Sequence, residues 1–307
     1  MKIFVTGATG FLGRHLVSFL KTRGHAVIGI SSKDCDLTCS SSLQQFANEK
    51  FDQIYHLACW TQAGDFCLHH PGEQWLINQK INTHVLDWWH ENQPQAKMIA
   101  MGTSCSYDPN LSLEEKNYLL GEPIESLYTY AMTKRMLLCG LKALQKQYGL
   151  EYLYLVPSTL YGEEYHNDGR QLHFIFDLIR KILRGHLYGE RVVLWGNGEQ
   201  KRELVHVRDF VQIMWGLADK QKNCVINIGS GKEYSIKEFA ELICDCVGYP
   251  FHKIEFDPVR YVGAKSKVLV IEKLREILLD FSTTSLKQGI EETVKWQMNT
   301  LQNSSFG

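Results

Sequence analysis

The stretch KIFVTGATGFLGRHL, residues 2–16, sets the fold class. A short apolar run ends at Gly7, and Gly10 and Gly13 follow before a segment with apolar residues at helical spacing. Glycines let the backbone turn sharply and approach a pyrophosphate, and the N–H groups at a helix N-terminus attract its charge. Because the motif lies at the first strand-to-helix junction, it predicts a dinucleotide-binding loop rather than an ordinary tight turn.

Strand-like and helix-like segments continue to alternate outward from this loop. Further apolar strands are expected at 25–30, 53–58, 97–102 and 151–157, which indicates a parallel sheet with helices on both faces. After Pro157 the pattern changes to a polar loop, an amphipathic helix and short returning strands. We predict an α/β protein, a Rossmann-type doubly wound parallel sheet with a smaller, partly interleaved C-terminal substrate lobe. The cofactor domain is assigned to 1–160 plus about 203–228, and the substrate lobe to about 161–202 and 229–307.

The composition favours a small-molecule enzyme. The 307 residues carry a formal net charge of -1 without basic or acidic blocks, so neither a nucleic-acid nor a membrane partner is expected. Nine cysteines lie scattered, without zinc-ligand spacing, which predicts no metal and suits a reducing cytoplasm. No long apolar run suggests a membrane span or a signal sequence, and we expect a cytoplasmic protein.

The residues after the second strand bear on the choice of cofactor. An acidic residue at this position binds the adenosine 2′-hydroxyl and repels a 2′-phosphate. Here Ser31, Ser32 and Lys33 occupy it, and Arg14 lies at the start of the first helix. Hydroxyls and cations favour NADP(H) over NAD(H), although Asp34 keeps NAD(H) open.

Tyr130 and Lys134 are spaced for acid/base chemistry. Four residues apart on a helix, they share one face. A neighbouring ammonium favours the phenolate, so we expect Lys134 to lower the pKa of Tyr130 toward working pH. The pair could also be incidental to an amphipathic helix, but the preceding glycine loop favours the catalytic interpretation.

The chain resembles the extended short-chain dehydrogenase/reductases, within the nucleotide-sugar epimerase/dehydratase superfamily. The matching motifs occur in family order and cover at least two-thirds of the chain: TGATGFLG (6–13), DQIYHLAC (52–59), GTSCSYD (102–108), Tyr130 with Lys134, VPSTLYG (156–162) and KRELVHVRDF (201–210). Within the superfamily it is most similar to the GDP-L-fucose synthases, which are NADPH-dependent 3,5-epimerase/4-reductases.

The resemblance implies a role for each matching residue. Thr103 and Ser104 would bind the sugar carbonyl, Tyr130 would protonate the C4 oxygen, and Cys105 and His173 would exchange protons during epimerisation. Core packing of Cys105 and helix capping by His173 are the competing interpretations. The expected cofactor contacts are Gly7, Thr9, Gly10, Phe11, Leu12, Gly13, Arg14, Ser31, Ser32, Lys33, Asp36, Leu37, Leu57, Ala58, Lys134, Pro157 and Leu160. The expected substrate contacts are Thr103, Ser104, Tyr130, Thr159, His173, Trp195, Arg202 and Lys267, the last two as cations for the diphosphate.

Two departures leave the sugar open. Thr159 replaces the asparagine of the fucose synthases, Glu163 replaces a proline, and the stretch 60–75 is unusually aromatic and polar. The alternatives are an epimerase alone, a plain 4-reductase for a hexose or heptose, or a silent dinucleotide-binding protein. A dehydratase is disfavoured because that branch carries Asp-Glu where this chain has Ser104 and Cys105. The resemblance also implies a homodimer through helices near 77–91 and 129–147.

Overall fold

The computed structural model describes residues 1–259, 265–279 and 281–304. Its main feature, among these residues, is a six-stranded sheet in the order β10-β5-β4-β3-β1-β2, in which every neighbouring pair is parallel. The predicted α/β, Rossmann-type fold class is confirmed. The strands are β1 (Lys2–Thr6), β2 (Ala26–Ile30), β3 (Gln53–His56), β4 (Lys97–Met101), β5 (Tyr152–Pro157) and β10 (Cys224–Ile228).

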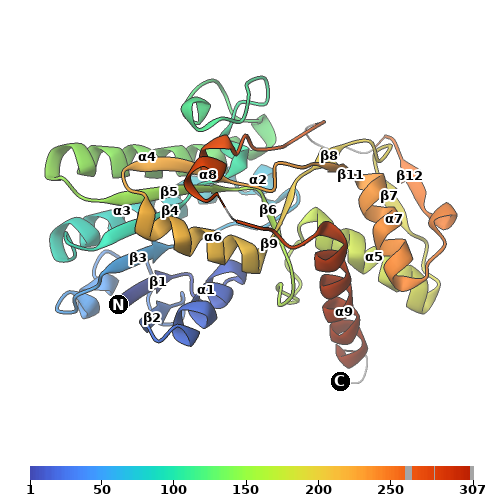
Figure 1. The fold of residues 1–307 in the computed structure, drawn as a ribbon, viewed down its shortest axis with the longest axis horizontal. Helices are drawn as coiled ribbons and strands as arrows, with labels where there is room; N and C mark the ends of the chain where they lie inside the picture. Colours follow the sequence, from blue (N-terminus) through green and yellow to red (C-terminus); the bar gives the residue numbers. More distant parts are fainter. Residues whose placement is uncertain (260–264, 280, 305–307) are drawn as a thin grey trace.

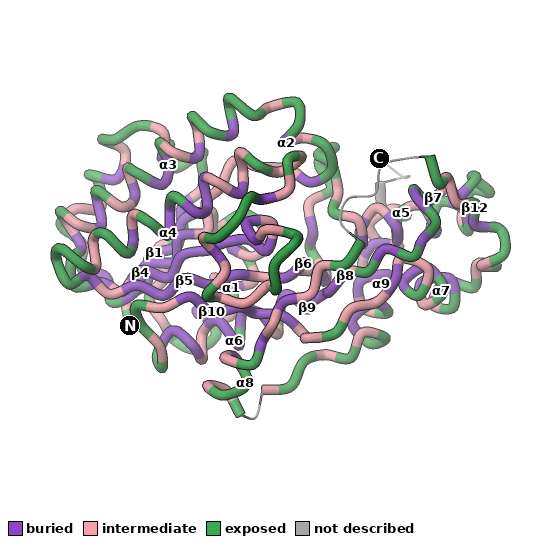
Figure 2. Tube along the Cα trace, turned by 90° about the horizontal axis from the view of Figure 1, so that it is seen from above, coloured by how far each residue is buried: buried purple, intermediate pink, exposed green. Residues whose placement is uncertain are grey.

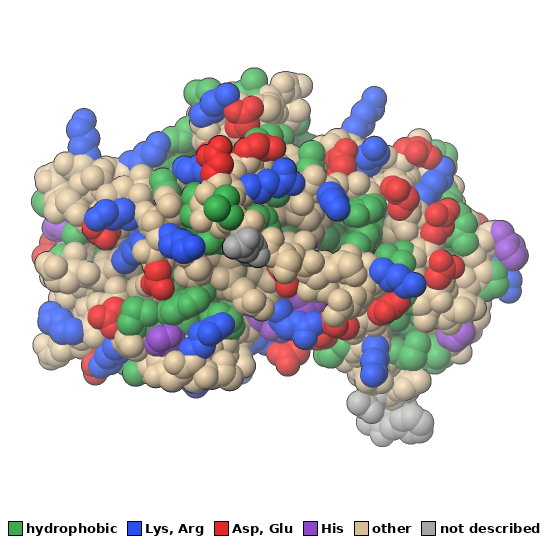
Figure 3. Space-filling model, viewed as in Figure 1, with side chains coloured by type: hydrophobic (Ala, Val, Ile, Leu, Met, Phe, Trp, Pro, Cys, Tyr) green, Lys and Arg blue, Asp and Glu red, His purple; other side chains and the backbone are tan. Residues whose placement is uncertain are grey.

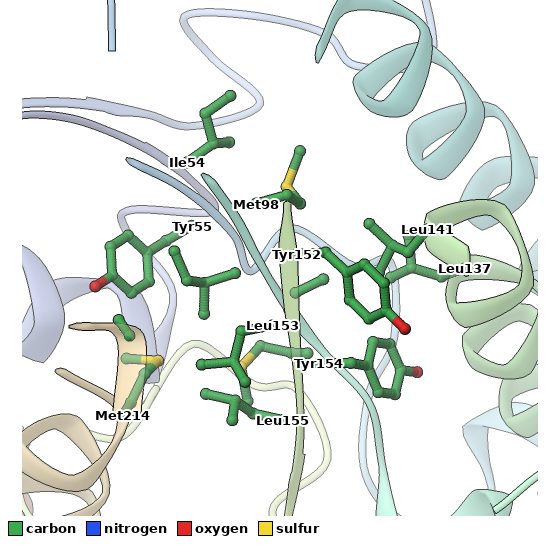
Figure 4. Close-up of a cluster of buried hydrophobic side chains, with 14 of the residues drawn as sticks. Ile54, Tyr55, Met98, Leu137, Leu141, Tyr152, Leu153, Tyr154, Leu155 and Met214 are labelled. Carbon is green, nitrogen blue, oxygen red and sulfur yellow. The ribbon is translucent and has the colours of Figure 1, made fainter. Parts of the chain in front are cut away.

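Helices cover both faces of the sheet. Helices α3 (Pro71–Asn92) and α4 (Tyr128–Tyr148) pack against each other on one face, and α1 (Phe11–Thr22) and α6 (Val207–Lys220) do so on the other. Successive residues of a strand point to opposite faces. In Figure 4, Tyr152 and Tyr154 lie toward Leu137 and Leu141 of α4, and Leu153 and Leu155 lie on the side of Met214 of α6. The central strands are therefore buried from both sides, as Figure 2 shows.

The strand order reverses at β1. Strand β2 lies on one side of β1 and β3 on the other, so the connections leave β1 in opposite directions. In open α/β sheets, ligands bind beyond the carboxyl ends of the strands at such a point. The glycine loop after β1 and residues 57–58 after β3 therefore meet where a dinucleotide is expected.

The smaller lobe has its own apolar core. Helices α5 (Phe174–Tyr188), α7 (Ile236–Val247) and α9 (Leu286–Ser304) pack together around it, and Figure 1 shows them beside the sheet domain. Three strand pairs complete the lobe and its junction: parallel β7 (Val193–Trp195) with β12 (Glu255–Asp257), antiparallel β8 (Lys201–Arg202) with β11 (Tyr234–Ser235), and parallel β6 (Thr159–Tyr161) with β9 (Leu204–His206).

One segment that the sequence analysis assigned to the smaller lobe lies on the sheet domain. Leu269, Ile271 and Leu274 are buried in the core of the sheet domain, and α8 (Glu272–Ile277) contacts β10. The chain therefore crosses between the lobes once more after residue 259. The remaining short elements are α2 (Phe66–His69) and the 3-10 turns η1 (Ser42–Phe46), η2 (Ser104–Ser106), η3 (Glu115–Asn117), η4 (Glu125–Leu127) and η5 (Phe251–Lys253).

On the face drawn in Figure 3, basic and acidic side chains are interspersed, in keeping with the net charge of -1. In the described part of the chain, every helix is too short or too polar to cross a membrane.

Candidate active site

The glycine loop presses directly against the end of β3. Gly7 has a φ of +67°, and a Cβ there would lie 2.9 Å from the backbone nitrogen of Ala58. A Cβ on Gly13 would lie 2.1 Å from the carbonyl oxygen of Gly7. The N–H groups of Leu57 and Ala58 donate to Oγ1 of Thr6, each at 3.1 Å, and so fix the neighbouring turn. Only glycine fits this close approach, which suits a loop that cradles a pyrophosphate.

Helix α1 begins at this loop without a side-chain cap. Its N-cap is Gly10, so its first N–H groups receive no side-chain acceptor, and Phe11 and Leu12 form its first turn. Such a terminus binds anions. Arg14 donates to the Thr9 carbonyl oxygen at 3.1 Å, which places its cation beside the loop.

The turn after β2 is closed by an acid. Asp34 accepts hydrogen bonds from the hydroxyl of Ser31, at 2.6 Å, and from its N–H, at 3.0 Å. These bonds hold the pKa of Asp34 below its usual range. Ser32 and Lys33 are exposed at the tip of the turn. Hydroxyls, a cation and a carboxylate thus all lie where the adenosine ribose would bind.

Two further predicted cofactor residues follow this turn. Asp36 accepts from the N–H and hydroxyl of Thr38, which lowers its pKa. Leu37 is buried in the core, and its carbonyl oxygen bonds to His84. Leu37 would therefore reach a cofactor only through its backbone.

Residues 103–105 form a tight turn after β4. Oγ1 of Thr103 accepts from the N–H of Cys105 at 3.2 Å and caps η2. The hydroxyl of Ser106 donates to the carbonyl oxygen of Ala131 at 3.1 Å, which ties the turn to helix α4. Thr103 and Ser104 are largely buried, and the turn presents them to the same space as Tyr130.

The Tyr130–Lys134 pair differs electrostatically from the prediction. Burial raises the pKa of Tyr130 well above 10, the nearby Cys59 and Cys105 add to this, and a hydrogen bond with Thr103 opposes it. Lys134 is buried and its ammonium acts on Cys59 and His56. The expected lowering of the Tyr130 pKa by Lys134 was wrong, because desolvation dominates and the ammonium bonds to Cys59.

Cys105 has a cationic partner. Nζ of Lys267 donates to its Sγ at 2.9 Å. Burial raises the pKa of the thiol, but Lys267, Thr103 and Arg202 together outweigh it, and the net direction is downward. Cys105 therefore differs from the apolar cysteines of the core, such as Cys244, whose pKa burial raises to about 12.

His173 stands at the entrance to α5. It is the N-cap residue, but its side chain makes no capping bond. Surrounding protein and the charge of Lys267 lower its pKa to about 4, so the imidazole is neutral at pH 7. The Lys267 ammonium contacts Cys105 and is near enough to His173 to lower its pKa, so one charge influences both predicted epimerisation groups.

The remaining predicted substrate residues come from the junction and the smaller lobe. Arg202, on β8, is close enough to influence Cys105. Trp195, on β7, is half-exposed, and Nζ of Lys181 lies 5.5 Å from its ring centre. Thr159 is half-buried on β6, near the predicted cofactor residues Pro157 and Leu160.

Sequence reasoning missed two features of the site. Cys59 and Cys67 lie near Cys105, and the pKa of Cys67 is raised to about 11 by burial. In addition, Nε2 of Gln171 donates to Asp65 at 2.6 Å, and the N–H of Asp65 donates back to Oε1 of Gln171 at 3.1 Å. The aromatic stretch 60–75 thereby holds the loop that leads to His173. The unusual composition of the stretch 60–75 was the sequence signal that could have indicated this role.

Comparison with known proteins agrees with this geometry. A profile described as "NAD dependent epimerase/dehydratase family" matches residues 3–229. The chain is 29% identical over 316 residues to "Probable GDP-L-fucose synthase 1" of Oryza sativa subsp. japonica, covering 98% of this chain and 93% of the relative. It is 25% identical over 319 residues to "dTDP-4-dehydro-6-deoxy-D-allose reductase" of Streptomyces bikiniensis, covering 96% of this chain and 95% of the relative.

A solved structure shows the same fold. The GDP-6-OMe-4-keto-L-xylo-heptose reductase from C. jejuni superposes with a TM-score of 0.88 at 21% identity, covering 97% of this chain and 98% of that one. The resemblance to nucleotide-sugar epimerases, and to GDP-L-fucose synthases among them, is confirmed. The family profile spans more than half of the chain, and the protein therefore belongs to the NAD dependent epimerase/dehydratase family of enzymes.

Proposed function

We propose that the protein is an NADPH-dependent 3,5-epimerase/4-reductase that acts on a nucleoside-diphosphate-linked 4-keto-6-deoxy sugar, with a GDP-linked sugar favoured. The observation that carries the proposal is the contact between Lys267 and Cys105, at 2.9 Å, on the turn that also presents Thr103 to Tyr130. A plain reductase has no need of a thiol beside an ammonium at this position. The relatives named as GDP-L-fucose synthases support the choice of substrate.

Reduction would use the Thr103–Tyr130 side of the site. NADPH, when bound, supplies the hydride. Thr103 and Ser104 would hold the C4 carbonyl oxygen, and Tyr130, which its raised pKa keeps protonated, would donate its proton to that oxygen. The glycine loop and Lys134 would position the cofactor, because they border the carboxyl ends of β1 and β3.

Epimerisation would use Cys105 and His173. The carbonyl at C4 makes the protons on the adjacent carbons acidic, and inversion needs removal from one face and delivery to the other. The Cys105 thiol, whose pKa is lowered, would remove one proton as a thiolate. The His173 imidazole is neutral at pH 7, so it would deliver a proton to the opposite face only after substrate binding has raised its pKa. Their placement about Lys267 supports these roles.

Two cations and one hydroxyl group support NADP(H) over NAD(H). Arg14 and Lys33 are cations beside the loop and the β2 turn, and Ser31 adds a hydroxyl. Asp34 is already engaged by Ser31, which weakens its role as a ribose ligand. Equilibrium binding of NADPH and NADH compares the two directly, and we expect tighter binding of NADPH.

The test is one reaction with two readouts. The protein is mixed with NADPH and GDP-4-keto-6-deoxymannose in deuterated water, cofactor oxidation is followed by absorbance, and the product is examined by NMR. We expect stoichiometric oxidation and deuterium at the epimerised carbons. The Cys105→Ala variant should oxidise NADPH without incorporating deuterium, and undiminished incorporation would show that Cys105 only packs.

A plain 4-reductase is the second candidate. The Streptomyces relative is named as a reductase, and Thr159 and Glu163 depart from the fucose synthase pattern. The Glu163 carboxylate lies 3.4 Å from both the His206 ring and the Arg208 guanidinium. Oxidation of NADPH with a hexose or heptose 4-keto sugar, without deuterium incorporation by the wild-type protein, would favour this candidate.

A further inference from the structure

The contact between Lys267 and Cys105 joins two distant parts of the chain. The two residues lie 162 positions apart, and both are half-buried. The ammonium donates to sulfur rather than facing an open anion site. Lys267 thus has a partner within the protein, whereas the family resemblance implied the diphosphate as its partner.

Backbone bonds on both sides fix the segment that carries Lys267. The carbonyl oxygen of Lys265 accepts from the N–H of Lys201 at 2.8 Å. The N–H of Leu269 donates to the carboxylate of Glu203 at 3.0 Å, and that fully buried carboxylate also accepts from the N–H of Gly231 at 2.6 Å. With the segment held in place, the Lys267 side chain alone is left to reorient.

The other groups around the thiol set its charge balance. Arg202 is a second cation near Cys105. Tyr130 and Cys67 also face it, but burial raises the pKa of both, that of Cys67 to about 11, so both are neutral at pH 7. Among these groups, two are cations and none is an anion, so the sulfur is surrounded by positive charge alone. An anion that binds between Arg202 and Lys267 would compete with the thiolate.

We propose that Lys267 is a shared counterion, which favours the thiolate form of Cys105 through the 2.9 Å contact and turns to the substrate diphosphate when a nucleotide sugar binds. This inference rests on the proposed function. Loss of the nearby cation raises the proton affinity of the sulfur, and a thiolate of higher proton affinity is the stronger base. The thiolate then takes the proton next to C4, and the electron pair of the C–H bond forms the enolate whose oxygen was the C4 carbonyl. Lys267 acts through Cys105 and is a positioning residue.

The experiment measures thiolate without turnover. Cys105 is alkylated with iodoacetamide across a range of pH, and its peptide is quantified by mass spectrometry in the wild type, Lys267→Met and Lys267→Arg. The exposed Lys265→Met is the matched control from the same segment. Each protein is measured alone and with saturating GDP, UDP or dTDP, with nucleotide binding followed by tryptophan fluorescence. The pH midpoint is compared rather than the rate, because a bound nucleotide slows access at every pH.

We expect Lys267→Met to raise the pH midpoint of Cys105 alkylation and to slow alkylation at pH 7 about tenfold. Lys267→Arg should retain much of the wild-type pH profile, and Lys265→Met should have the wild-type profile. Nucleotide should raise the wild-type midpoint by more than that of Lys267→Met, in which only Arg202 and the bound anion itself still act on the sulfur. A wild-type midpoint in Lys267→Met would overturn the proposal. Nucleotide binding without a shift would overturn the shared role of Lys267 alone, whereas no binding of any of the three nucleotides would contradict the proposed function as well.

Discussion

Tyr130 and His56 show how burial sets the chemistry of single residues. Desolvation raises the pKa of the Tyr130 phenol well above 10, so the phenol carries its proton at neutral pH but is a weaker acid than a free tyrosine. His56 ends strand β3, and its ring is hydrogen-bonded to Thr6 at 2.9 Å and to Asn82 at 3.1 Å. Burial lowers its pKa to about 4, and it is a neutral structural residue.

Replacing Tyr130 with Phe should abolish proton donation and leave cofactor binding intact. We expect NADPH oxidation with the keto sugar to fall by about 10²–10⁴-fold, the usual contribution of a positioned acid, while the NADPH dissociation constant stays unchanged. Steady-state kinetics and fluorescence titration measure the two quantities. Tyr128→Phe, an exposed position on the same helix, is the control and should behave as wild type. Full activity in Tyr130→Phe would remove this residue from the mechanism.

His56 should make the folded protein sensitive to acid. Its pKa is 6.5 in a free chain and about 4 when folded, so between these values the unfolded chain binds more protons and stability falls as pH falls. The shift corresponds to about 3 kcal/mol, fully available above pH 6.5 and lost by pH 4. The free energy of unfolding, measured with urea, should fall between pH 7 and pH 4 in both proteins. In His56→Gln this fall should be smaller than in the wild type by about this amount. Equal losses in the two proteins would assign acid sensitivity to other groups.

At the scale of elements, the site depends on loops held by other loops. The glycine loop is positioned by the turn after β3, and the 103–105 turn by helix α4. His173 has the least direct support, since its ring makes no capping bond. The paired hydrogen bonds between Asp65 and Gln171 connect its loop to the 60–75 stretch.

Removing this connection should impair epimerisation more than reduction. Gln171→Ala frees the loop before His173, and we expect deuterium exchange to slow about tenfold, because small misplacements of reacting groups have large effects on rate. NADPH oxidation should change little. Asp65→Ala and the double variant complete a double-mutant cycle. Strictly additive effects would show that the pair does not act as a unit.

At the scale of the whole molecule, an ion network joins the two lobes. Glu163, His206 and Glu292 have ligand atoms within 4.8 Å of one another; they come from the turn after β6, from β9 and from α9. The N–H of Arg208 donates to Nδ1 of His206 at 3.3 Å, which leaves the proton of the neutral ring on Nε2, facing Glu163 at 3.4 Å. With the Arg208 guanidinium paired to both carboxylates, the cluster is a salt-bridge network, because the protonated Nε2 is not available to a metal.

The outer face of α3 and α4 predicts a dimer. The helices pack side by side and expose large apolar residues, among them Leu76 at 60% and Met136 at 43%. We expect a homodimer through this face, in line with the family resemblance. Met136→Glu introduces a charge into the apolar contact, so sedimentation equilibrium should show this variant shifted toward the monomer. Leu120→Glu, exposed outside both helices, is the control. A monomeric wild-type protein at micromolar concentration would contradict the prediction.

Local sequence was sufficient for the fold class and for the cofactor loop. Strand-like runs alternate with helical ones, and close backbone contacts leave no room for a side chain at Gly7 and Gly13. Such features depend on periodicity and on side-chain size, which the sequence displays directly. The Tyr130–Lys134 spacing likewise predicted a shared helix.

Charge states and distant partners required the folded chain. The pKa of Tyr130 follows from desolvation by its surroundings, and the partner of Cys105 comes from a segment 162 residues away. The placement of Leu269 on the sheet domain and the bonds between Asp65 and Gln171 are equally non-local. Burial and long-range contact exist only after the chain has packed, and local periodicity carries no record of them.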